Sequence, residues 1–372
     1  MTDPAPSAPF PFRQATLFAL GAGLLKLLLV LFAVHWIRSH GQELKLCSWD
    51  CGYYREIATT GYRWDPVGHG PLAFFPLFPF LMRGLQALTG LTFEVQAIAA
   101  NLVLFTVAVF LLVYWSFQLG LGRLAFLPAV LWTADRNTFW AGIPYTEPLF
   151  SCLLLSFLIL GRSVWPQSFA LRALLQSVCG MFAGATRLVG VALIAALGLG
   201  RWGTFWRRPF LGATVLLLGL SGILAFFAFN HFAFGAWSRS LETTAHWGRH
   251  FSILGFFNSW WTLARAFYFP TFPLLVLTSV LLVQRRFSAS ERWLHFFLAF
   301  IPLASSIPIS LTRYLSLLFM GYVGAAELAA RGLGRHPRAV RALFFVFVLS
   351  ELAWQAHLLI KYFRGEVFFA VS

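Results

Sequence analysis

The sequence predicts an all-α polytopic membrane protein, and three observations support this fold class. Of the 372 residues, 59% are hydrophobic, 18% are aromatic and only 11% are charged. The mean hydropathy is +0.74, and a soluble domain of this composition would expose much apolar surface to water. Apolar runs recur along the chain, and each helix of about 20 apolar residues can cross the bilayer. We therefore expect one unit with about eleven transmembrane helices.

The apolar runs are not all alike. The run at 72–90 contains two prolines and an arginine, which favours a helix that lies at the interface or re-enters. The runs at 173–186 and 188–200 predict a hairpin of short helices that crosses the bilayer only in part. The remaining runs lie at residues 15–34, 96–117, 121–134, 147–160, 210–230, 264–283, 293–311, 314–330 and 342–360.

The N-terminal region predicts a tail followed by an anchor. Residues 1–14 are rich in Pro, Ala and Ser, which is typical of a disordered segment, here expected to be cytoplasmic. The run at 15–34 contains Lys26 and lacks a small-residue cleavage site, so we expect a retained signal anchor. We expect a single transmembrane domain at 15–362, followed by a C-terminal tail at 363–372. Within this domain, residues 35–95 are expected to form the first extracytoplasmic loop, which contains interfacial helices.

The distribution of charge predicts the orientation. Short connectors rich in arginine fall on one side of the expected spans, and that side should be cytoplasmic. The longer loops, at about 35–72 and 231–263, fall on the opposite side with most of the acids. Chemistry carried by those acids would therefore be extracytoplasmic. The chain has no Asn-x-Ser/Thr sequon and no retention signal, which favours a bacterial cytoplasmic membrane over the endoplasmic reticulum of a eukaryote.

The net charge is +15, and the positions of Lys and Arg along the chain indicate which partners it favours. Lys and Arg stand singly between apolar runs, with no basic domain, so nucleic acid is not an expected partner. Anionic membrane lipids and phosphate-bearing lipid substrates fit this pattern better.

Four cysteines occur, and two of them, Cys47 and Cys51, lie on either side of Trp49 and Asp50. Their spacing is compatible with a metal site or a local bridge. Two small loop residues are the favoured interpretation, because no His or second Cys pair completes a metal-binding set.

Asp50 opens an aromatic stretch in the first outer loop. A carboxylate at the membrane face is partly desolvated, which makes it a stronger base. The alternative is a helix N-cap, because residues 53–59 can form a helix and Asp commonly precedes one. Both roles are left open.

Glu147 lies between two prolines and is expected in the first turn of a helix, where an acid interacts favourably with the helix dipole. Because it falls on the same side as Asp50, a shared site is the functional alternative. A divalent ion held by the two carboxylates is left open, although no third ligand is evident.

Short motifs then follow one another in a recognisable order: Trp-Asp at 49–50, Gly-Tyr at 52–53, Phe-Phe-Pro-Leu-x-Pro at 74–79, Pro-Tyr-Thr-Glu-x-Leu-Phe at 144–150, Ala-Thr-Arg-x-x-Gly at 185–190, Trp-Gly-Arg at 247–249 and Arg-Tyr at 313–314. This series resembles the PIG-V-like mannosyltransferases, which belong to the GT-C class of membrane glycosyltransferases. The resemblance extends over about residues 15–330.

The resemblance implies a GT-C-like catalytic domain that takes mannose, or another hexose, from a polyprenyl or dolichyl phosphate sugar donor. The acceptor would be a lipid-linked or cell-surface glycan. Asp50 and Glu147 occupy the positions of the family's catalytic acids. The sequence departs from the pattern at Cys51 and at Tyr53, where the family often has Trp, and these changes bear on acceptor choice rather than on reaction type.

An inverting transfer needs a base on the acceptor hydroxyl and stabilisation of the departing phosphate. Arginines offer planar paired donors for phosphate, although an interfacial anchor is the favoured interpretation of Arg187 and of Arg313 when each is taken singly. Aromatic side chains would stack on sugars or form an interfacial belt, and His246 would bind hydroxyls or simply be solvated. The predicted substrate-binding residues are Trp49, Tyr53, Tyr62, Tyr145, Arg187, His246, Trp247, Arg249, Arg313 and Tyr314; no metal ligand and no cofactor is predicted.

Two other classes compete. A lipid or sugar transporter, or flippase, would show related halves with paired broken helices, and no internal repeat is evident. A catalytically silent assembly subunit would keep the fold without the acids, so the presence of Asp50 and Glu147 argues against it.

Overall fold

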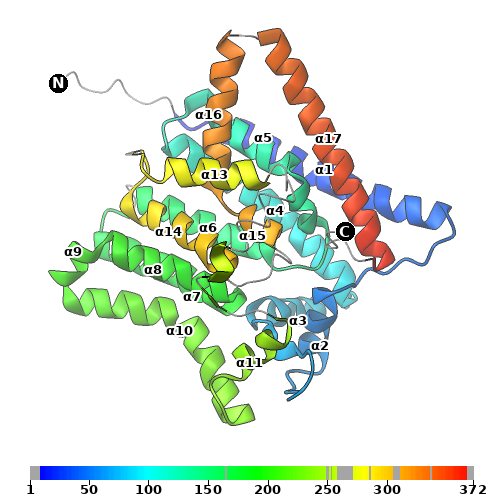
Figure 1. Ribbon diagram of the computed structural model, residues 1–372, viewed down its shortest axis with the longest axis vertical. Coiled ribbons are helices and arrows are strands. Elements are labelled where there is room, and N and C mark those ends of the chain that lie inside the picture. Colours follow the sequence, from blue (N-terminus) through cyan, green and yellow to red (C-terminus); the bar gives the residue numbers. More distant parts are fainter. Residues whose placement is uncertain are drawn as a thin grey trace.

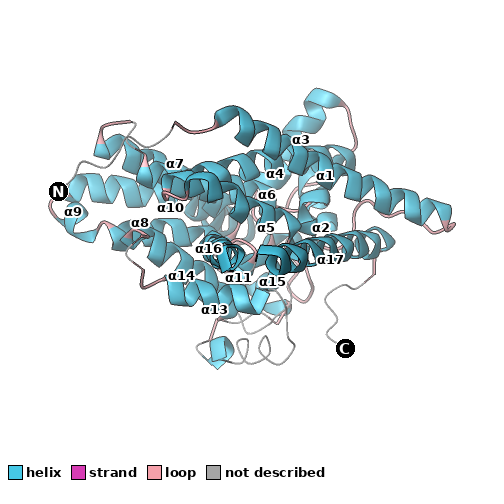
Figure 2. Cartoon of the chain, turned by 90° about the horizontal axis from the view of Figure 1, so that it is seen from above, coloured by secondary structure: helices cyan, strands magenta, loops and turns pink. Residues whose placement is uncertain are grey.

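The computed structural model describes residues 9–163, 166–248, 251–252, 254–257, 271–284, 286–304, 311–335 and 337–366. This part of the chain consists of helices and the loops between them, as Figure 2 shows. The predicted all-α class is confirmed. In chain order the elements are α1 (Phe12–Ser39), α2 (Asp50–Thr59), η1 (Pro71–Ala73), α3 (Leu77–Thr89), α4 (Phe93–Gln118), η2 (Gly122–Ala125), α5 (Phe126–Ala134), η3 (Arg136–Gly142), α6 (Glu147–Arg162), α7 (Phe169–Thr186), η4 (Leu188–Gly190), α8 (Val191–Gly200), α9 (Trp202–Trp206), α10 (Pro209–Phe234), α11 (Arg239–His246), α13 (Thr271–Leu281), α14 (Ala289–Leu303), α15 (Leu311–Leu315), α16 (Phe319–Arg335) and α17 (Pro337–Arg364).

Among the described residues, five helices are long and apolar enough to cross a membrane: α1, α4, α7, α10 and α17. A sixth span results if η3 and α6, which meet at a bend of 107°, are counted together. The expected number was about eleven. Several apolar runs of the described chain form short or broken helices, such as η2 followed by α5, which fall below the length of a plain span. The expected runs at 264–283 and 293–311 lie partly outside the described residues.

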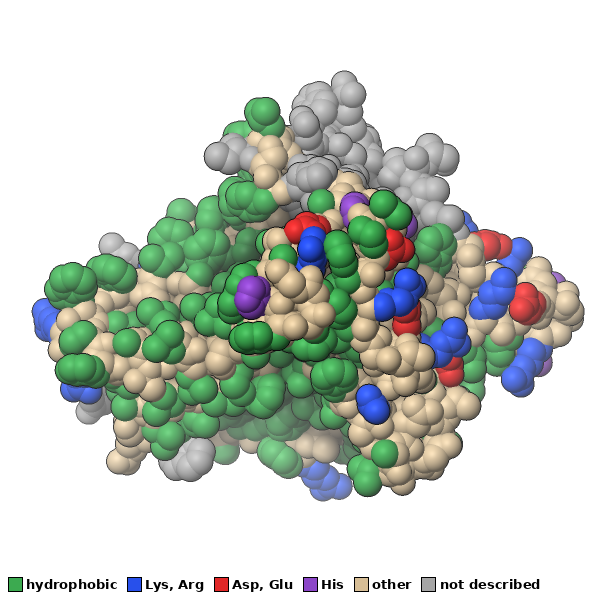
Figure 3. Space-filling model, turned by 90° about the horizontal axis from the view of Figure 1, so that it is seen from below, with side chains coloured by type: hydrophobic (Ala, Val, Ile, Leu, Met, Phe, Trp, Pro, Cys, Tyr) green, Lys and Arg blue, Asp and Glu red, His purple; other side chains and the backbone are tan. Residues whose placement is uncertain are grey.

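The first outer loop contains short helices, as predicted. Pro76 precedes α3, which is 13 residues long and ends at Gly90 in the left-handed conformation, so α3 is too short to cross. Its buried side includes Phe78 and Met82, whereas Leu88 on the other side is exposed. Figure 3 shows the face of the protein that lies at the bottom of Figure 1. Charged side chains gather over the half of this face around α2 and α3, and mainly hydrophobic ones cover the half around α9 and α10.

The predicted short hairpin is present, but its first arm is longer than expected. α7 begins at Phe169 and is long enough to cross, whereas α8 is not. The chain turns sharply between them, and a Cβ atom on Gly190 would lie 2.2 Å from the carbonyl carbon of Ala183. Glycine at 190 therefore permits the close approach on which this turn depends.

α1 and α17 lie side by side and run in the same direction (Figure 1). Near their middles, Lys26 of α1 bonds to Gln355 of α17. Near their C-terminal ends, the backbone N–H of Lys45 donates to the carbonyl of Phe363 at 2.7 Å. The C-terminal end of α17 is thus fixed beside the loop that leads to Asp50.

Polar side chains support the break in the chain between α5 and η3. The Nε2 group of Gln355 donates to three carbonyls of this break, those of Thr133, Ala134 and Asp135, at 2.7–3.0 Å. Lys26 Nζ donates to the Thr133 carbonyl at 2.9 Å. Non-helical backbone at membrane depth is stable only where protein groups satisfy it, and these side chains do so here.

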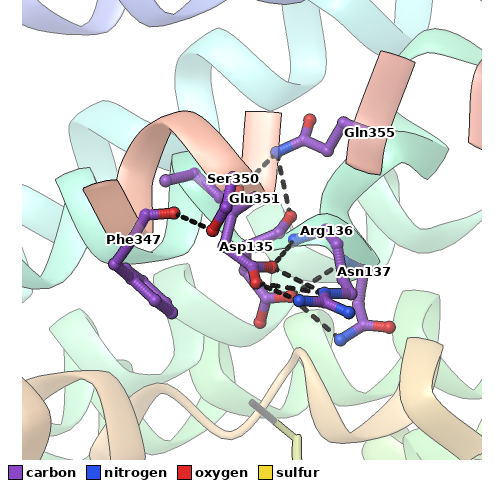
Figure 4. A network of polar contacts seen from close by, with 8 residues as sticks. Asp135, Arg136, Asn137, Phe347, Ser350, Glu351 and Gln355 are labelled. Atoms are coloured by element: carbon purple, nitrogen blue, oxygen red, sulfur yellow. Dashed lines mark hydrogen bonds and ion pairs between the residues drawn. The ribbon is translucent and has the colours of Figure 1, made fainter. Parts of the chain in front are cut away.

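An ion pair completes this junction, and Figure 4 shows its two side chains facing each other. Glu351 accepts from the backbone N–H of Arg136 at 2.9 Å and pairs with the guanidinium of the same residue. Asp135 is buried and accepts hydrogen bonds from Tyr322 and Asn137. It caps η3 inside the protein.

Candidate active site

Four charged side chains from distant parts of the sequence form what we call the ion-pair cluster: Asp50, Glu147, Arg187 and Arg313. Arg313 Nη2 lies 2.9 Å from Asp50 Oδ2, and Arg313 Nη1 lies 3.3 Å from Glu147 Oε1. Arg187 Nη1 lies 2.7 Å from the same oxygen of Glu147. Arg313 therefore bridges the two acids that the sequence analysis expected to share a site.

Each member of the cluster lies at a helix terminus or in a very short helix. Asp50 and Glu147 occupy the first turns of α2 and α6, where the helix dipole favours a negative charge. Arg187 follows the last residue of α7 in extended conformation, and Arg313 belongs to the five-residue α15. Asp50 itself is not the N-cap, because that position is taken by Trp49 and no side-chain cap bond forms.

The members differ in their exposure to solvent. The side chain of Asp50 is 25% exposed, whereas that of Glu147 is 1% exposed. Both guanidiniums are buried, with 9% and 4% of their side chains exposed. Asp50 is therefore the carboxylate that a substrate can reach, and Glu147 is placed to hold the two arginines.

Burial decides between the two interpretations of the arginines. An interfacial anchor would direct its guanidinium towards headgroups, but Arg187 and Arg313 direct theirs towards buried carboxylates. The anchor interpretation is wrong for both residues. The physical reason is that a buried carboxylate such as Glu147 needs nearby positive charge, and two arginines supply it.

Two predicted tyrosines pack on the arginines of the cluster. The guanidinium carbon of Arg313 lies 4.5 Å from the ring centre of Tyr145, and that of Arg187 lies 4.2 Å from the ring centre of Tyr314. These are cation–π contacts, which hold the guanidinium planes in place. Asn101 fixes the segment before Glu147 by donating to the carbonyls of Ile143 and Tyr145 at 2.6 and 2.8 Å.

The backbone before Asp50 is unusual in two respects. Trp49 has a φ of 57°, and among the described residues no other residue apart from glycine has a positive φ. Cys47 and Cys51 form a disulfide, with 5.2 Å between their Cα atoms. The interpretation of these cysteines as two separate loop residues is wrong, because the first turn of α2 brings Cys51 back within bridging distance of Cys47.

Aromatic residues form a second group, the outer aromatic cluster, which consists of Tyr53, Phe74, His69 and Trp247. Tyr53 stacks on Phe74 with ring centres 4.8 Å apart, and Trp247 meets Tyr53 edge to face at 5.7 Å. His69 lies 4.1 Å from Trp247. Burial raises the pKa of the Tyr53 hydroxyl, and the nearby carboxylates of Glu56 and Asp50 raise it further, so this group stays a neutral donor.

Tyr62 links this cluster to an apolar groove. Its hydroxyl donates to the carbonyl of Phe74 at 2.9 Å, and its ring packs on Phe226 and Phe229 of α10. The groove has a cavity volume of about 500 Å³ and lies between α3, α7 and α10. It is lined by Tyr62, Pro76, Leu77, Phe80, Met181, Phe182, Ala185, Ser221, Gly222, Ala225, Phe226 and Phe229.

Two predicted site residues belong to neither cluster, and a third lies outside the residues that the structure describes. Trp49 is half exposed and its indole N–H donates to the carbonyl of Glu366 at 3.2 Å. His246 contacts the carbonyl of Gly68 through Nδ1 at 2.9 Å, so it fastens a loop. Arg249 lies outside the described residues.

The sequence analysis missed two residues at the cluster. Thr146 accepts from Arg187 Nη1 at 3.2 Å and is fully buried. Tyr54 is buried against Phe74 and Phe78. Thr146 lies within the motif at 144–150 and Tyr54 directly follows the motif at 52–53, so their positions as polar neighbours of the two acids are the signal in the sequence.

Among the described residues, the two carboxylates of the site lack the further ligands that a divalent ion requires. No group of three or more His, Cys, Asp or Glu side chains comes together in the described ranges. Between Asp50 and Glu147, the position that a shared ion would occupy is taken by the guanidinium of Arg313. Hard cations need several oxygen ligands, and two guanidiniums at the same place oppose them by charge.

Taken together, the helices and their broken connections define a polytopic membrane protein with a GT-C-like fold. No family model and no curated protein matches this chain. Among solved structures, the chain resembles ArnT from Cupriavidus metallidurans bound to undecaprenyl phosphate, with a TM-score of 0.57 and 15% identity over 95% of this chain and 76% of ArnT.

It also resembles the Archaeoglobus fulgidus oligosaccharyltransferase in complex with zinc and sulfate, with a TM-score of 0.50 and 14% identity. That comparison covers 92% of this chain and 53% of the oligosaccharyltransferase, so the chain spans about half the length of that protein. At such identities the two comparisons show a common fold, and the activity must be argued from the site.

Proposed function

We propose that this chain is a membrane glycosyltransferase that transfers a sugar, in the first instance mannose, from a polyprenyl phosphate donor to a lipid-linked or cell-surface glycan. The observation that carries the proposal is the pairing of a reachable carboxylate, Asp50, with the buried Arg313, which also contacts a second acid, Glu147, beside the buried Arg187. An inverting transfer to a hydroxyl requires such a base and such a counter-charge.

Asp50 acts as the base in this proposal. It takes the proton of the acceptor hydroxyl while the hydroxyl oxygen bonds to the anomeric carbon of the sugar. The bond from that carbon to the phosphate oxygen breaks, and its electron pair leaves with the lipid phosphate. The 25% exposure of the Asp50 side chain supports this role, because the acceptor can reach it.

Arg313 and Arg187 receive the charge of the leaving phosphate. In the free protein Arg313 is paired with Asp50, and a bound phosphate would compete for the same guanidinium. Binding of the donor would thereby release Asp50 from its ion pair and leave it able to accept a proton. Glu147 keeps both arginines in place throughout, since it is buried between them.

Two further observations support a lipid donor at the outer face. The apolar groove beside Tyr62 offers an uncharged surface for a hydrocarbon chain, and α7, which lines it, leads directly to Arg187. The disulfide between Cys47 and Cys51 supports an extracytoplasmic position for the loop of Asp50, because disulfides persist in oxidising compartments.

Reconstituted protein tests the proposal. Purified protein in lipid vesicles is given undecaprenyl phosphate mannose, or the glucose analogue, with a panel of glycolipid acceptors, and the release of undecaprenyl phosphate is followed. We expect transfer by the wild type, and for Asp50→Asn a rate that is lower by a factor of about a hundred or more. Glu43→Gln is the matched control, because Glu43 is an exposed acid of the same loop, paired only with Lys45 at 3.4 Å.

Equal transfer by Asp50→Asn and the wild type would remove Asp50 from the mechanism. Movement of the undecaprenyl phosphate sugar between the two leaflets of the vesicle without sugar transfer would favour a flippase. A difference between the mannose and glucose donors would identify the sugar.

A further inference from the structure

Ser316 connects Arg313 of the site to the break in the chain between α5 and η3. Its hydroxyl donates to the carbonyl of Arg313 at 2.6 Å. The same hydroxyl oxygen accepts from the indole N–H of Trp140 at 3.2 Å, and the Ser316 carbonyl accepts from that of Trp132 at 3.0 Å. One buried serine thus takes part in three hydrogen bonds that connect it to α15, η3 and α5.

The two tryptophans are themselves held firmly. Both are fully buried, with ring centres 5.8 Å apart, and Trp132 stacks on Phe105 of α4 at 4.9 Å. Trp132 lies in α5 and Trp140 in η3, on the two sides of the break that Lys26 and Gln355 support. Rigid donors on both sides of the break therefore bond to Ser316, the residue that directly follows α15.

We propose that Ser316 is a positioning residue for Arg313. A helix of five residues has too few internal hydrogen bonds to define its own orientation. The bonds at Ser316 supply that orientation by fixing the carbonyl of Arg313 and the chain directly after it. The guanidinium of Arg313 is then held at its bridging position between Asp50 and Glu147.

This inference rests on the proposed function, in which Arg313 binds the donor phosphate. A shift of the guanidinium by about 1 Å would weaken its contact with phosphate, and misplacement of that size can cost up to about a hundredfold in a site that depends on geometry. Binding of the hydrocarbon chain would not change, because the apolar groove lies on other elements.

The test separates positioning from simple stability by comparing Ser316→Ala, Trp140→Phe and the double variant. Ser316→Ala leaves the buried N–H of Trp140 without an acceptor, which lowers the Tm. The double variant removes both partners, and such paired removal can be nearly neutral for stability. We therefore expect the Tm of the double variant to return towards the wild-type value.

The second readout is the ratio of two dissociation constants, for undecaprenyl phosphate and for uncharged undecaprenol, measured in nanodiscs. We expect the wild type to favour the phosphate, and the ratio to fall about tenfold in both Ser316→Ala and the double variant. Ser177→Ala is the matched control, because Ser177 is equally buried and donates to the carbonyl of Ala173 at 2.9 Å on a different helix.

Recovery of the wild-type ratio together with the Tm in the double variant would overturn the inference, since Ser316 would then be merely structural. A fall in the ratio for Ser177→Ala would overturn it as well, because the effect would be general. A wild type that binds both lipids equally would overturn the proposed function and this inference with it.

Discussion

At the scale of single residues, the cluster contains as many positive as negative charges, but the charges are not equivalent. Glu147 is buried and contacts two guanidiniums, whereas Asp50 is partly exposed and contacts one. A buried ion pair costs desolvation energy when it forms, and the loss of one partner leaves an uncompensated charge. The two acids therefore have different roles although both pair with Arg313.

This difference predicts the effect of neutralising Glu147. Glu147→Gln leaves Arg187 and Arg313 buried beside a neutral group, so we expect the free energy of unfolding to fall by about 3 to 5 kcal/mol. Asp50→Asn should lower it by much less, because the side chain of Asp50 is partly solvated. Denaturant titration in detergent micelles measures both variants, with Glu43→Gln as the control. Equal losses for the two acids would contradict the distinction.

The sequence identified the acids but not their partners. Asp50 and Glu147 stand in motifs with distinctive neighbours, and the first-turn position of Glu147 followed from its prolines. The pairing of Asp50 with Arg313 spans 263 positions along the chain, and no local pattern predicts a contact at that separation. The buried state of the arginines depends on the same long-range contacts, which explains why the anchor interpretation was wrong.

At the scale of elements, helix ends and one very short helix place every residue of the ion-pair cluster. α2 begins directly at Asp50, and the disulfide ties Cys51 in its first turn to the preceding loop. Trp49, which directly precedes Asp50, has a positive φ, and residues other than glycine rarely adopt this backbone conformation. The bridge therefore maintains the start of α2 in the position from which Asp50 reaches Arg313.

Reduction of this disulfide should lower activity more than stability. The bridge closes a loop of a few residues, so its loss costs at most about 2 kcal/mol of stability. We expect the transfer rate to fall about tenfold when the start of α2 relaxes and Asp50 moves away from its position. Sugar transfer is measured with and without dithiothreitol for the wild type and for the variant in which both Cys47 and Cys51 are Ser.

The double serine variant should be as slow as the reduced wild type and insensitive to the reductant. Cys152→Ser is the control, since Cys152 is a free cysteine in α6. It should stay as sensitive to dithiothreitol as the wild type. A wild type that keeps its full rate after reduction would show that the bridge does not position Asp50.

At the scale of the whole molecule, composition predicted the polytopic helical class but not where individual helices break. Apolar runs such as 121–134 were counted as crossings because hydropathy does not reveal where a helix breaks. The breaks are supported by single polar residues far away in the sequence, for example Lys26 and Gln355 at the end of α5. In the sequence, such residues are isolated polar side chains within an apolar run. Their hydrogen-bond partners become evident only in the folded chain.

The orientation of the whole chain gives the last prediction. Connectors such as that around Arg207 are rich in arginine, which retains them in the cytoplasm, whereas the loop with Glu43 and the disulfide should face outward. Both positions are exposed, so cysteines introduced there can react with a thiol reagent. In intact cells, a membrane-impermeant maleimide should label Glu43→Cys at once and Arg207→Cys only after permeabilisation. The unchanged parent protein controls for the two free cysteines, Cys152 and Cys179, which are partly buried. The reverse pattern of labelling would place Asp50 on the cytoplasmic side and would require a donor that is delivered there.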